Sequence, residues 1–284
     1  MAIVKFEGKP IEKLIDVIAQ AIGVVYEPTR IRRKAKAEVY RYELLSEAKA
    51  NGQILKVSTD LNLAEQARER NLHQEINRQI NINSIADQAA GFLGEKVSER
   101  PVDQDWRSRF FNKAKDIYNE EMQAIWGKIL AEEVTEPGSL SLRTLDILSN
   151  ISRDEAIKFQ KVCKVTFDNG EIHRSVLNDK NPLLTPIDYG DIIILRAAGL
   201  LHSNDHITFQ YPFSEELGGA KFTFGKRKYL LRHETRKDNI FNMLAMSSEG
   251  VQLMNAIGIE KDMDHFMRFK KEANVFGYTI EELY

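Results

Sequence analysis

The sequence predicts a mostly α-helical protein with a smaller mixed α/β part at its C-terminal end. In the first half of the chain, apolar residues recur at steps of three and four, which is the spacing of helices. After Lys164 the pattern changes to short β-prone runs that glycine and charged residues separate. We therefore expect a helical domain over residues 1–161, which includes αα-hairpins. Residues 162–284 should form an α/β module whose order of helix and strands is compatible with a winged-helix-like unit.

An amphipathic helix is predicted near the N-terminus. Pro10 occupies a first-turn position that proline favours, and Gly23 ends the segment. Five apolar residues fall on one face: Ile11, Leu14, Ile15, Ile18 and Ile22. We expect this face to pack in a core or between subunits. The alternative, a helix on a membrane surface, is disfavoured because the polar face carries little positive charge.

A strongly basic helix is predicted after Pro28. Its cations are Arg30, Arg32, Arg33, Lys34, Lys36 and Arg41. They surround the helix on all sides, so carboxylates of the same chain cannot satisfy all of them. Two interpretations remain open. The helix is either solvated and paired with acidic neighbours, or it contacts the phosphates of a nucleic acid or nucleotide.

A long helix is predicted to end near Leu93, and a polar layer interrupts it at the stretch NRQININ. Glu75, Arg78, Gln79 and Asn83 lie within two turns of one another and are expected to form a buried network. Because such a layer often fixes the register or the oligomeric state of packed helices, we expect a homo-oligomer.

Two further helices carry the tryptophans. Trp106 lies in a helix that an aspartate caps, and Trp126 lies on the apolar face of the next helix. Pro137 and Gly138 end that helix, because proline lacks a backbone N–H and glycine tolerates a positive φ. The leucine-rich segment that follows opens a second apolar face. The region 119–148 therefore predicts an αα-hairpin with a tryptophan in its seam.

Three carboxylates gather at the C-terminal end of the first helix of this hairpin: Glu132, Glu133 and Glu136. Negative charge is unfavourable at a helix C-terminus, so these side chains require partners. We expect them to pair with Lys128, with Arg143 or with another subunit.

Within the mixed module, VTFDNGEIH predicts two short strands around an Asp-Asn-Gly turn. A helix is expected to end at RAAGLL, where Gly199 suits the residue after a helix. Four β-prone runs follow: ITFQYPF, AKFTF, KYLLRHE and NIFNMLAM. Two helices then close the module, one capped by Ser247 or Ser248 and one over about 261–274.

Composition excludes several classes of protein. The 284 residues carry a formal net charge of −2, so attraction to nucleic acid or anionic membrane requires a local patch. The single cysteine, Cys163, excludes an internal disulfide and a multi-cysteine metal site, and it favours the cytoplasm. No apolar run approaches the ~20 residues of a membrane-spanning helix, and the N-terminus lacks the apolar run of a signal peptide. We expect a cytoplasmic protein without a transmembrane segment.

The sequence contains no familiar catalytic constellation. It has no phosphate-binding glycine loop, no dinucleotide fingerprint and no His-Glu-x-x-His zinc helix. We therefore predict no catalytic residue, no metal ligand and no cofactor. His202 and His206 are four residues apart, but they follow a helix end and do not share a helix face. Asp168 and Glu171 come nearest to a nuclease pattern, and they lack its Glu-x-Lys form.

The segment QAIWGKILAEEVTEPGSLSLRTLDILSNISRDEAIKF resembles a bacterial family catalogued as a domain of unknown function. AIGVVYEPTRIRRKAKAE resembles it too, as does HQEINRQININSIADQA before DWRSRFF, so the similarity spans about residues 11–164. Members resemble proteins found near prophages and abortive-infection genes, which implies a role in anti-phage defence. The resemblance implies a structural role, in the geometry of the turn, for the matching residues Trp126, Pro137, Gly138, Ser139, Arg143 and Thr144.

Three functions remain open on these residues and this resemblance. The first is a non-enzymatic anti-phage defence protein, acting as an oligomeric sensor or blocker of a phage component, with a phage or host protein as partner. The second is a nucleic-acid-binding regulatory module that uses the basic helix of residues 30–41. The third is a metal-dependent nuclease-type effector that uses Asp168 and Glu171.

Overall fold

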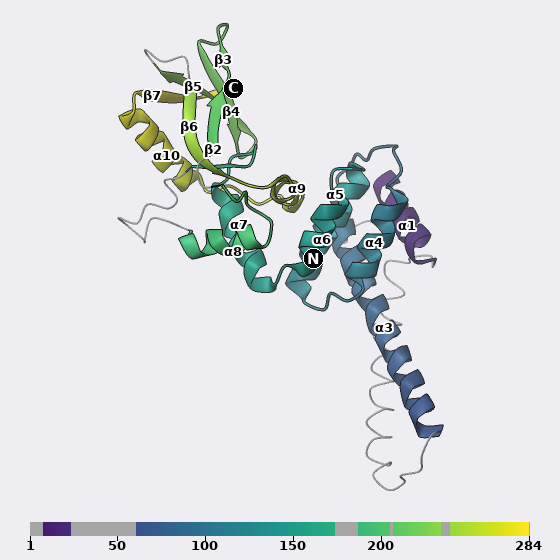
Figure 1. The fold of residues 1–284 in the computed structure, drawn as a ribbon. Helices are drawn as coiled ribbons and strands as arrows, with labels where there is room; N and C mark the ends of the chain where they lie inside the picture. The colour runs from purple at the N-terminus through teal and green to yellow at the C-terminus, as the bar shows by residue number, and fades with distance from the viewer. Residues whose placement is uncertain (1–7, 24–60, 174–186, 205–206, 234–238, 284) are drawn as a thin grey trace. The chain divides into compact units, whose positions relative to one another are not determined.

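The computed structural model describes residues 8–23, 61–173, 187–204, 207–233 and 239–283 (Figure 1). The chain divides into two compact units, Met1–Leu142 (unit 1) and Arg143–Tyr284 (unit 2). This division comes earlier in the chain than the change of sequence pattern, which predicted a boundary after Lys161. The cations of the predicted basic helix, Arg30, Arg32, Arg33, Lys34, Lys36 and Arg41, lie outside the described residues, as does His206.

The described part of unit 1 is helical. Its helices are α1 (Lys9–Ile22), α3 (Leu61–Phe92), α4 (Gln104–Ala114) and α5 (Glu120–Thr135). The side chain of Asp103 accepts a hydrogen bond from the Trp106 amide, and that of Asn119 accepts one from the Met122 amide. Both helices therefore begin at a capping residue. Gly23 ends α1 in the left-handed conformation, with φ 71°.

The core of unit 1 forms where α1, α4 and α5 meet the C-terminal half of α3. Trp126 is fully buried, and its ring centroid lies 5.1 Å from that of Phe110. Trp106 stacks on Phe110 with a centroid distance of 5.0 Å. Gly127 lets α5 approach α3 closely, since a Cβ there would lie 2.5 Å from the Cβ of Gln88. Both tryptophans therefore act in packing.

A buried polar layer joins α3 to α5 and to the segment before α5. Gln123 Nε2 donates to Asn81 Oδ1 at 3.1 Å and to the carbonyl of Ile117 at 2.8 Å. Asn81 Nδ2 donates to the carbonyl of Lys115 at 2.8 Å, and Ser84 Oγ donates to Gln123 Oε1 at 2.7 Å. These bonds satisfy amide groups that the apolar surroundings would otherwise leave unpaired.

The predicted members of the polar layer divide between surface and interior. Arg78 lies at the surface, where it pairs with Glu75 at 2.6 Å and with Asp116 at 2.8 Å. Gln79 donates to Asn83 Oδ1 at 2.9 Å, and Asn83 is buried. The expectation of one buried network is therefore wrong for its two charged members. The physical reason is that the N-terminal half of α3 is largely exposed and enters the core only further along the helix.

Replacing Gln123 with leucine should lower the free energy of unfolding of unit 1 by about 2 kcal/mol, because buried partners lose their hydrogen bonds. Both tryptophans lie in unit 1, so tryptophan fluorescence in a denaturant titration measures this quantity. Gln104→Leu, at an exposed position of α4, is the matched control and should stay within about 0.5 kcal/mol of wild type. Equal stability of the two variants would contradict the role of the layer.

Unit 2 combines helices with short strands. Its helices are α6 (Leu142–Asn150), which starts at the boundary, α7 (Arg153–Val165), α8 (Tyr189–Ala197), α9 (Ser248–Ile257) and α10 (Met263–Val275). Its strands are β1 (Glu171–His173), β2 (Ile207–Tyr211), β3 (Phe213–Ser214), β4 (Gly219–Phe224), β5 (Arg227–His233), β6 (Asn239–Ala245) and β7 (Tyr278–Leu283). Ser152 and Glu155 form the predicted capping box of α7, and Ser247 caps α9.

The described strands form two antiparallel sheets, ordered β1-β6-β2 and β3-β4-β5-β7 (Figure 1). Helix α10 covers one face of the second sheet, where its Phe266 and Phe269 meet Phe222 and Phe224 of β4. Phe167, which follows α7, joins this aromatic cluster with its centroid 5.3 Å from that of Phe224. The opposite, outer face carries the exposed Lys221, Thr223 and Lys228 together with the buried Leu230.

One local prediction for unit 2 is wrong, and one strand was not predicted. Among the described residues before the Asp-Asn-Gly turn no strand forms, because α7 continues to Val165 and Thr166 Oγ1 then bonds to the carbonyl of Val162. Strand β7 was not predicted, although its apolar and polar residues alternate. The winged-helix-like description stays a prediction. So does the packing of α5 against α6, since these helices lie on either side of the division between the units.

Candidate functional site

The buried carboxylate of Glu133 organises the Pro-Gly turn after α5. Its Oε1 accepts a hydrogen bond from the amide of Gly138 at 2.6 Å. Its Oε2 accepts from the amide of Leu140 at 3.1 Å and from the hydroxyl of Ser139 at 3.3 Å. Gly138 has φ 90°, a conformation that strains any other residue. The turn therefore supplies the partners for this carboxylate that the sequence suggested would be cations.

Arg100 connects this turn to a groove on unit 1. Its Nη2 lies so close to Gly138 that a Cβ on the glycine would be 2.9 Å away. The positive charge of Arg100 favours the ionised form of Glu133, whereas burial raises the pKa of that carboxyl group. The amide of Arg100 also donates to Ser98 Oγ at 3.2 Å, which helps to hold the extended segment 97–102 in place.

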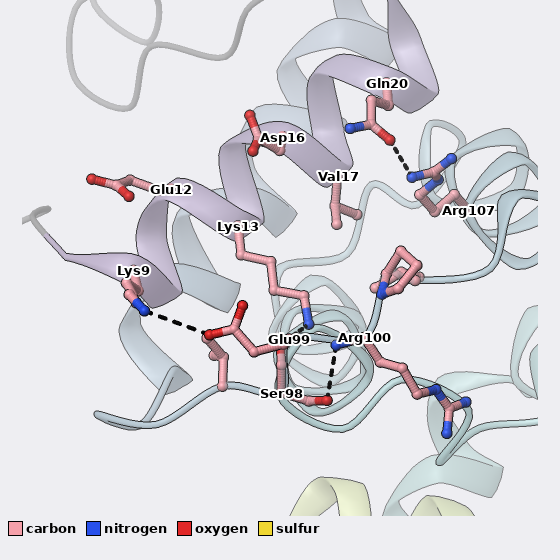
Figure 2. A pocket seen from close by; sticks show the side chains of 13 residues that line it. Lys9, Glu12, Lys13, Asp16, Val17, Gln20, Ser98, Glu99, Arg100 and Arg107 are labelled. Atoms are coloured by element: carbon pink, nitrogen blue, oxygen red, sulfur yellow. Dashed lines mark hydrogen bonds and ion pairs between the residues drawn. The ribbon is translucent and has the colours of Figure 1, made fainter.

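The groove lies between α1 and the segment 97–102 and has a volume of about 350 Å³ (Figure 2). One wall is a stripe of α1 that includes Lys13, Val17 and Gln20, which are spaced at steps of three and four. The other wall is the segment 97–102 together with Arg107 of α4. Charged residues of both walls line the groove: the cations are Lys9, Lys13, Arg100 and Arg107, and the carboxylates are Glu12, Asp16 and Glu99.

Lys13 lies in the groove on the N-terminal half of α1. Its Nζ donates to the carbonyl of Ser98 at 2.7 Å (Figure 2). Partial burial lowers the pKa of Lys13, and the negative charges of Glu99 and Glu133 oppose that effect. Lys9 Nζ lies 3.5 Å from Glu99 Oε1 at the exposed rim. A partly desolvated ammonium group attracts an anion more strongly than a fully hydrated one.

Arg107 lies at the other end of the groove. Its Nη1 donates to Gln20 Oε1 at 2.5 Å. Its Nε is enclosed and makes no hydrogen bond with any residue that the structure describes. Buried donors without a partner are uncommon in folded proteins, so the setting of this guanidinium group is unusual. Figure 2 shows the carboxylate of Glu12 pointing away from both Lys13 and Arg107.

The groove offers cations at both ends and an apolar floor that Val17, Val97 and Val102 contribute. The stretch of α1 from Lys9 to Gln20 is about 16 Å long at 1.5 Å per residue. An extended peptide covers that length with about five residues. The arrangement therefore suits a short extended segment that carries an acidic group.

The residues that the sequence motif singled out lie elsewhere in the two units. The tryptophans are in the core of unit 1, and residues 137–139 form the turn that binds the buried carboxylate. Arg143 is exposed, with 80% of its side-chain surface accessible and its Nε 3.9 Å from Glu249 Oε1. Sequence reasoning missed Lys13 and Arg107, because single basic residues on amphipathic helices carry no signal of their own.

The two carboxylates closest to a nuclease pattern serve different parts of unit 2. Asp168 accepts hydrogen bonds from the amides of Gly225 at 3.0 Å and Lys226 at 2.8 Å, so it holds the β4–β5 turn. Glu171 is buried and accepts a hydrogen bond from the hydroxyl of Tyr211, and burial raises its pKa. Among the described residues, no group of three or more His, Cys, Asp or Glu side chains is placed to hold a metal ion.

A second cavity, of about 370 Å³, lies in unit 2 beside Lys261. Lys261 Nζ donates to the carbonyl of Cys163 at 2.9 Å and to that of Thr166 at 2.7 Å, at the C-terminal end of α7. Burial lowers the pKa of this amine and raises the pKa of the Cys163 thiol to about 12. The ammonium group thus caps a helix end, and the thiol is not activated as a nucleophile.

A family model described as "Protein of unknown function (DUF2806)" matches residues 65–270. The chain belongs to the DUF2806 family. The matched range contains the Arg100 and Arg107 wall of the groove, whereas α1 precedes it. No curated protein and no solved structure matches this DUF2806 chain. In the described parts of the chain, none of the helices has the length and apolar character needed to cross a bilayer.

Proposed function

We propose that this DUF2806 chain is a non-enzymatic protein of bacterial anti-phage defence, which senses or blocks a phage component as a homo-oligomer. In this proposal the groove of unit 1 binds a short acidic segment of a phage or host protein between Lys13 and Arg107. The observation that carries the proposal is that Lys13 and Arg107 line one groove, with the Arg107 Nη1 held by Gln20 and the carboxylate of Glu12 pointing away from both cations. The defence role rests on the resemblance of several sequence segments to abortive-infection-associated proteins.

The charge and shape of the groove support a peptide of this kind. Lys13 and Arg107 are two of the cations that line the groove, and Val17, Val97 and Val102 contribute apolar surface to the same lining. Half-buried cations such as these make charge-assisted hydrogen bonds, which are stronger than those between neutral groups. A side-chain carboxylate on an extended segment meets both requirements.

The double variant Lys13→Glu/Arg107→Glu should abolish protection without unfolding the protein, because it places like charges where the acidic group binds. Protection is measured as the efficiency of plating of a phage panel on cells that carry the chain, compared with an empty vector. Tryptophan fluorescence melting shows whether unit 1 remains folded.

Arg109→Glu is the matched control for this experiment. Arg109 is an exposed arginine on the same helix as Arg107, and it does not line the groove. This variant should protect as well as wild type. Equal loss in the two variants, unchanged protection in the double variant, or no protection by the wild-type chain would each contradict the proposal.

A direct test places a photo-crosslinking amino acid at Gln20, inside the groove, and at Arg109 as the outside position. After infection, the Gln20 chain should form an adduct that maps to an acidic segment, and the Lys13→Glu change should remove it. Light scattering supplies the test of assembly. A strict monomer at micromolar concentration would overturn the oligomeric part of the proposal.

A further inference from the structure

A run of cations marks the hairpin that β4 and β5 form in unit 2. Residues 221–228, KFTFGKRK, contain four basic side chains and no acid, in a chain with a net charge of −2. The four basic side chains, Lys221, Lys226, Arg227 and Lys228, are all exposed. The hairpin is therefore a local basic feature of the kind that overall charge does not reveal.

The strand register places two of these cations on the outer face of the sheet. Phe222 and Phe224 point into the aromatic core, so Lys221 and Thr223 point outward. Lys228 lies directly opposite Thr223 across the ladder. Lys221 and Lys228 are therefore diagonal neighbours on one face, about 7–8 Å apart.

Most of this charge has no counter-charge within the protein. Arg227 approaches Glu282 at 3.8 Å, and Glu281 on the neighbouring strand pairs with Arg232 at 2.5 Å. The remaining three cations, Lys221, Lys226 and Lys228, form no ion pair with any residue of the described chain. Like charges at this spacing repel one another, so the cluster weakens the hairpin unless an external anion is present.

The hairpin tip is held in an unfavourable backbone conformation. Gly225 and Lys226 both have φ 64°, and Lys226 is the one non-glycine residue with positive φ among those described. A side chain in this region costs about 1 kcal/mol relative to glycine. Asp168 stabilises the turn by accepting hydrogen bonds from both amides. These two hydrogen bonds stabilise the strained turn, and the side chain of Lys226 adds no ion pair within the described chain.

We propose that Lys221 and Lys228, on the outer face of the β4–β5 hairpin, and Lys226, at its tip, bind the phosphate backbone of a nucleic acid. Two lysines in diagonal positions can each meet one of two adjacent phosphates, and the Thr223 hydroxyl between them adds a donor. Such contacts depend on the charge of the phosphates and not on the base sequence. This site is independent of the groove in unit 1 and of the function proposed for it.

The composition of this face favours nucleic acid over a membrane surface. A protein surface that inserts among lipids presents large apolar or aromatic side chains beside its cations. The large apolar side chains that are exposed in the described chain lie outside β4 and β5. The hairpin therefore offers charge and a hydroxyl group but no anchor for acyl chains.

Fluorescence anisotropy tests the proposal, with the full chain and a short labelled DNA duplex or its RNA equivalent as probe. In the triple variant Lys221→Thr/Lys226→Asn/Lys228→Thr, binding at about 50 mM salt should weaken at least tenfold, and the slope of log affinity against log salt should fall by about 2–3. Threonine suits a strand and asparagine tolerates a positive φ, so thermal stability should equal or exceed that of wild type.

A charge-matched control removes three exposed lysines from helices of the same unit: Lys161→Gln/Lys164→Gln/Lys271→Gln. This control should bind as wild type does. The proposal is overturned if the wild-type chain binds neither probe at low salt, or if the two triple variants bind alike. It is also overturned if only Arg32, Arg33 and Lys36 prove necessary, or if the hairpin lysines matter for phosphatidylserine vesicles and not for nucleic acid.

Discussion

Glu133→Ala should destabilise unit 1 by about 3 kcal/mol, the larger of the two single-site effects expected there. The carboxylate accepts hydrogen bonds from the amides of Gly138 and Leu140 and from the hydroxyl of Ser139. Removing it breaks these three hydrogen bonds to a buried carboxylate, at about 1 kcal/mol or more for each; Leu140 is buried as well, whereas Gly138 is exposed. Gln at this position should lie between wild type and Ala, because its amide keeps one acceptor and turns a donor toward a backbone N–H.

Denaturant unfolding followed by tryptophan fluorescence measures this loss, since both tryptophans belong to unit 1. Glu136→Ala is the matched control, because the exposed Glu136 lies at the same turn. It should change the free energy of unfolding by less than about 0.5 kcal/mol. If Glu133→Ala were as stable as this control, the turn would be held by the proline and glycine alone.

Lowering the pH from about 6.5 to about 4 should remove several kcal/mol of stability from unit 2. Burial lowers the pKa of His173 to about 4, and the charge of His265 acts in the same direction. Burial likewise lowers the pKa of His265 to about 4. Both imidazoles are therefore neutral when folded and take up a proton on unfolding. Their stabilisation is complete above the unfolded pKa of about 6.5 and is lost as the pH falls toward 4, at about 3 kcal/mol for each histidine.

The charged groups around this pair do not reverse the sign. Glu272 Oε2 lies 3.8 Å from His173 Nδ1, Asp262 favours the protonated form of His265, and Arg268 disfavours it. The contact of the His173 ring with Phe269, at 4.7 Å between centroids, keeps that imidazole in an apolar setting. Desolvation is the largest of these influences for both groups.

Hydrogen exchange of unit 2 amides at a series of pH values measures the effect. The double variant His173→Leu/His265→Leu should show a flatter dependence on pH between about 6.5 and 4. His202→Gln, at an exposed histidine of the same unit, should retain the wild-type slope. A double variant with the wild-type slope would show that carboxylates alone cause the acid sensitivity.

Periodicity in the sequence predicted the helices well, because most of them bury a stripe of apolar residues along their length. Caps were also predictable, since Ser152 and Glu155 or Ser247 act within one turn of chain. The strand β7 was missed because its place in the sheet depends on pairing with β5, far earlier in the chain, which leaves no mark in the local sequence. The first strand of VTFDNGEIH was predicted for β-prone residues of which α7 includes Val165, while Thr166 is the C-cap of that helix, so tertiary context overrides local preference here.

The candidate groove was not predictable from these patterns. It depends on α1 lying against the segment 97–102, and the bond from Lys13 to the Ser98 carbonyl joins residues 85 positions apart. The role of Glu133 was hidden for a similar reason, because its partners are backbone amides that leave no mark in the sequence. The aspartate at 168 was noticed as a potential catalyst, whereas its observed partners are the amides of the hairpin tip.

The buried position of Cys163 makes its thiol a native probe of local opening in unit 2. The thiol is fully enclosed, it is the sole cysteine of the chain, and its pKa near 12 keeps it protonated at neutral pH. An alkylating reagent can therefore reach it only during moments when α7 detaches from its surroundings. The rate at which the thiol is alkylated therefore measures how often this part of unit 2 opens, and the experiment needs no engineered label.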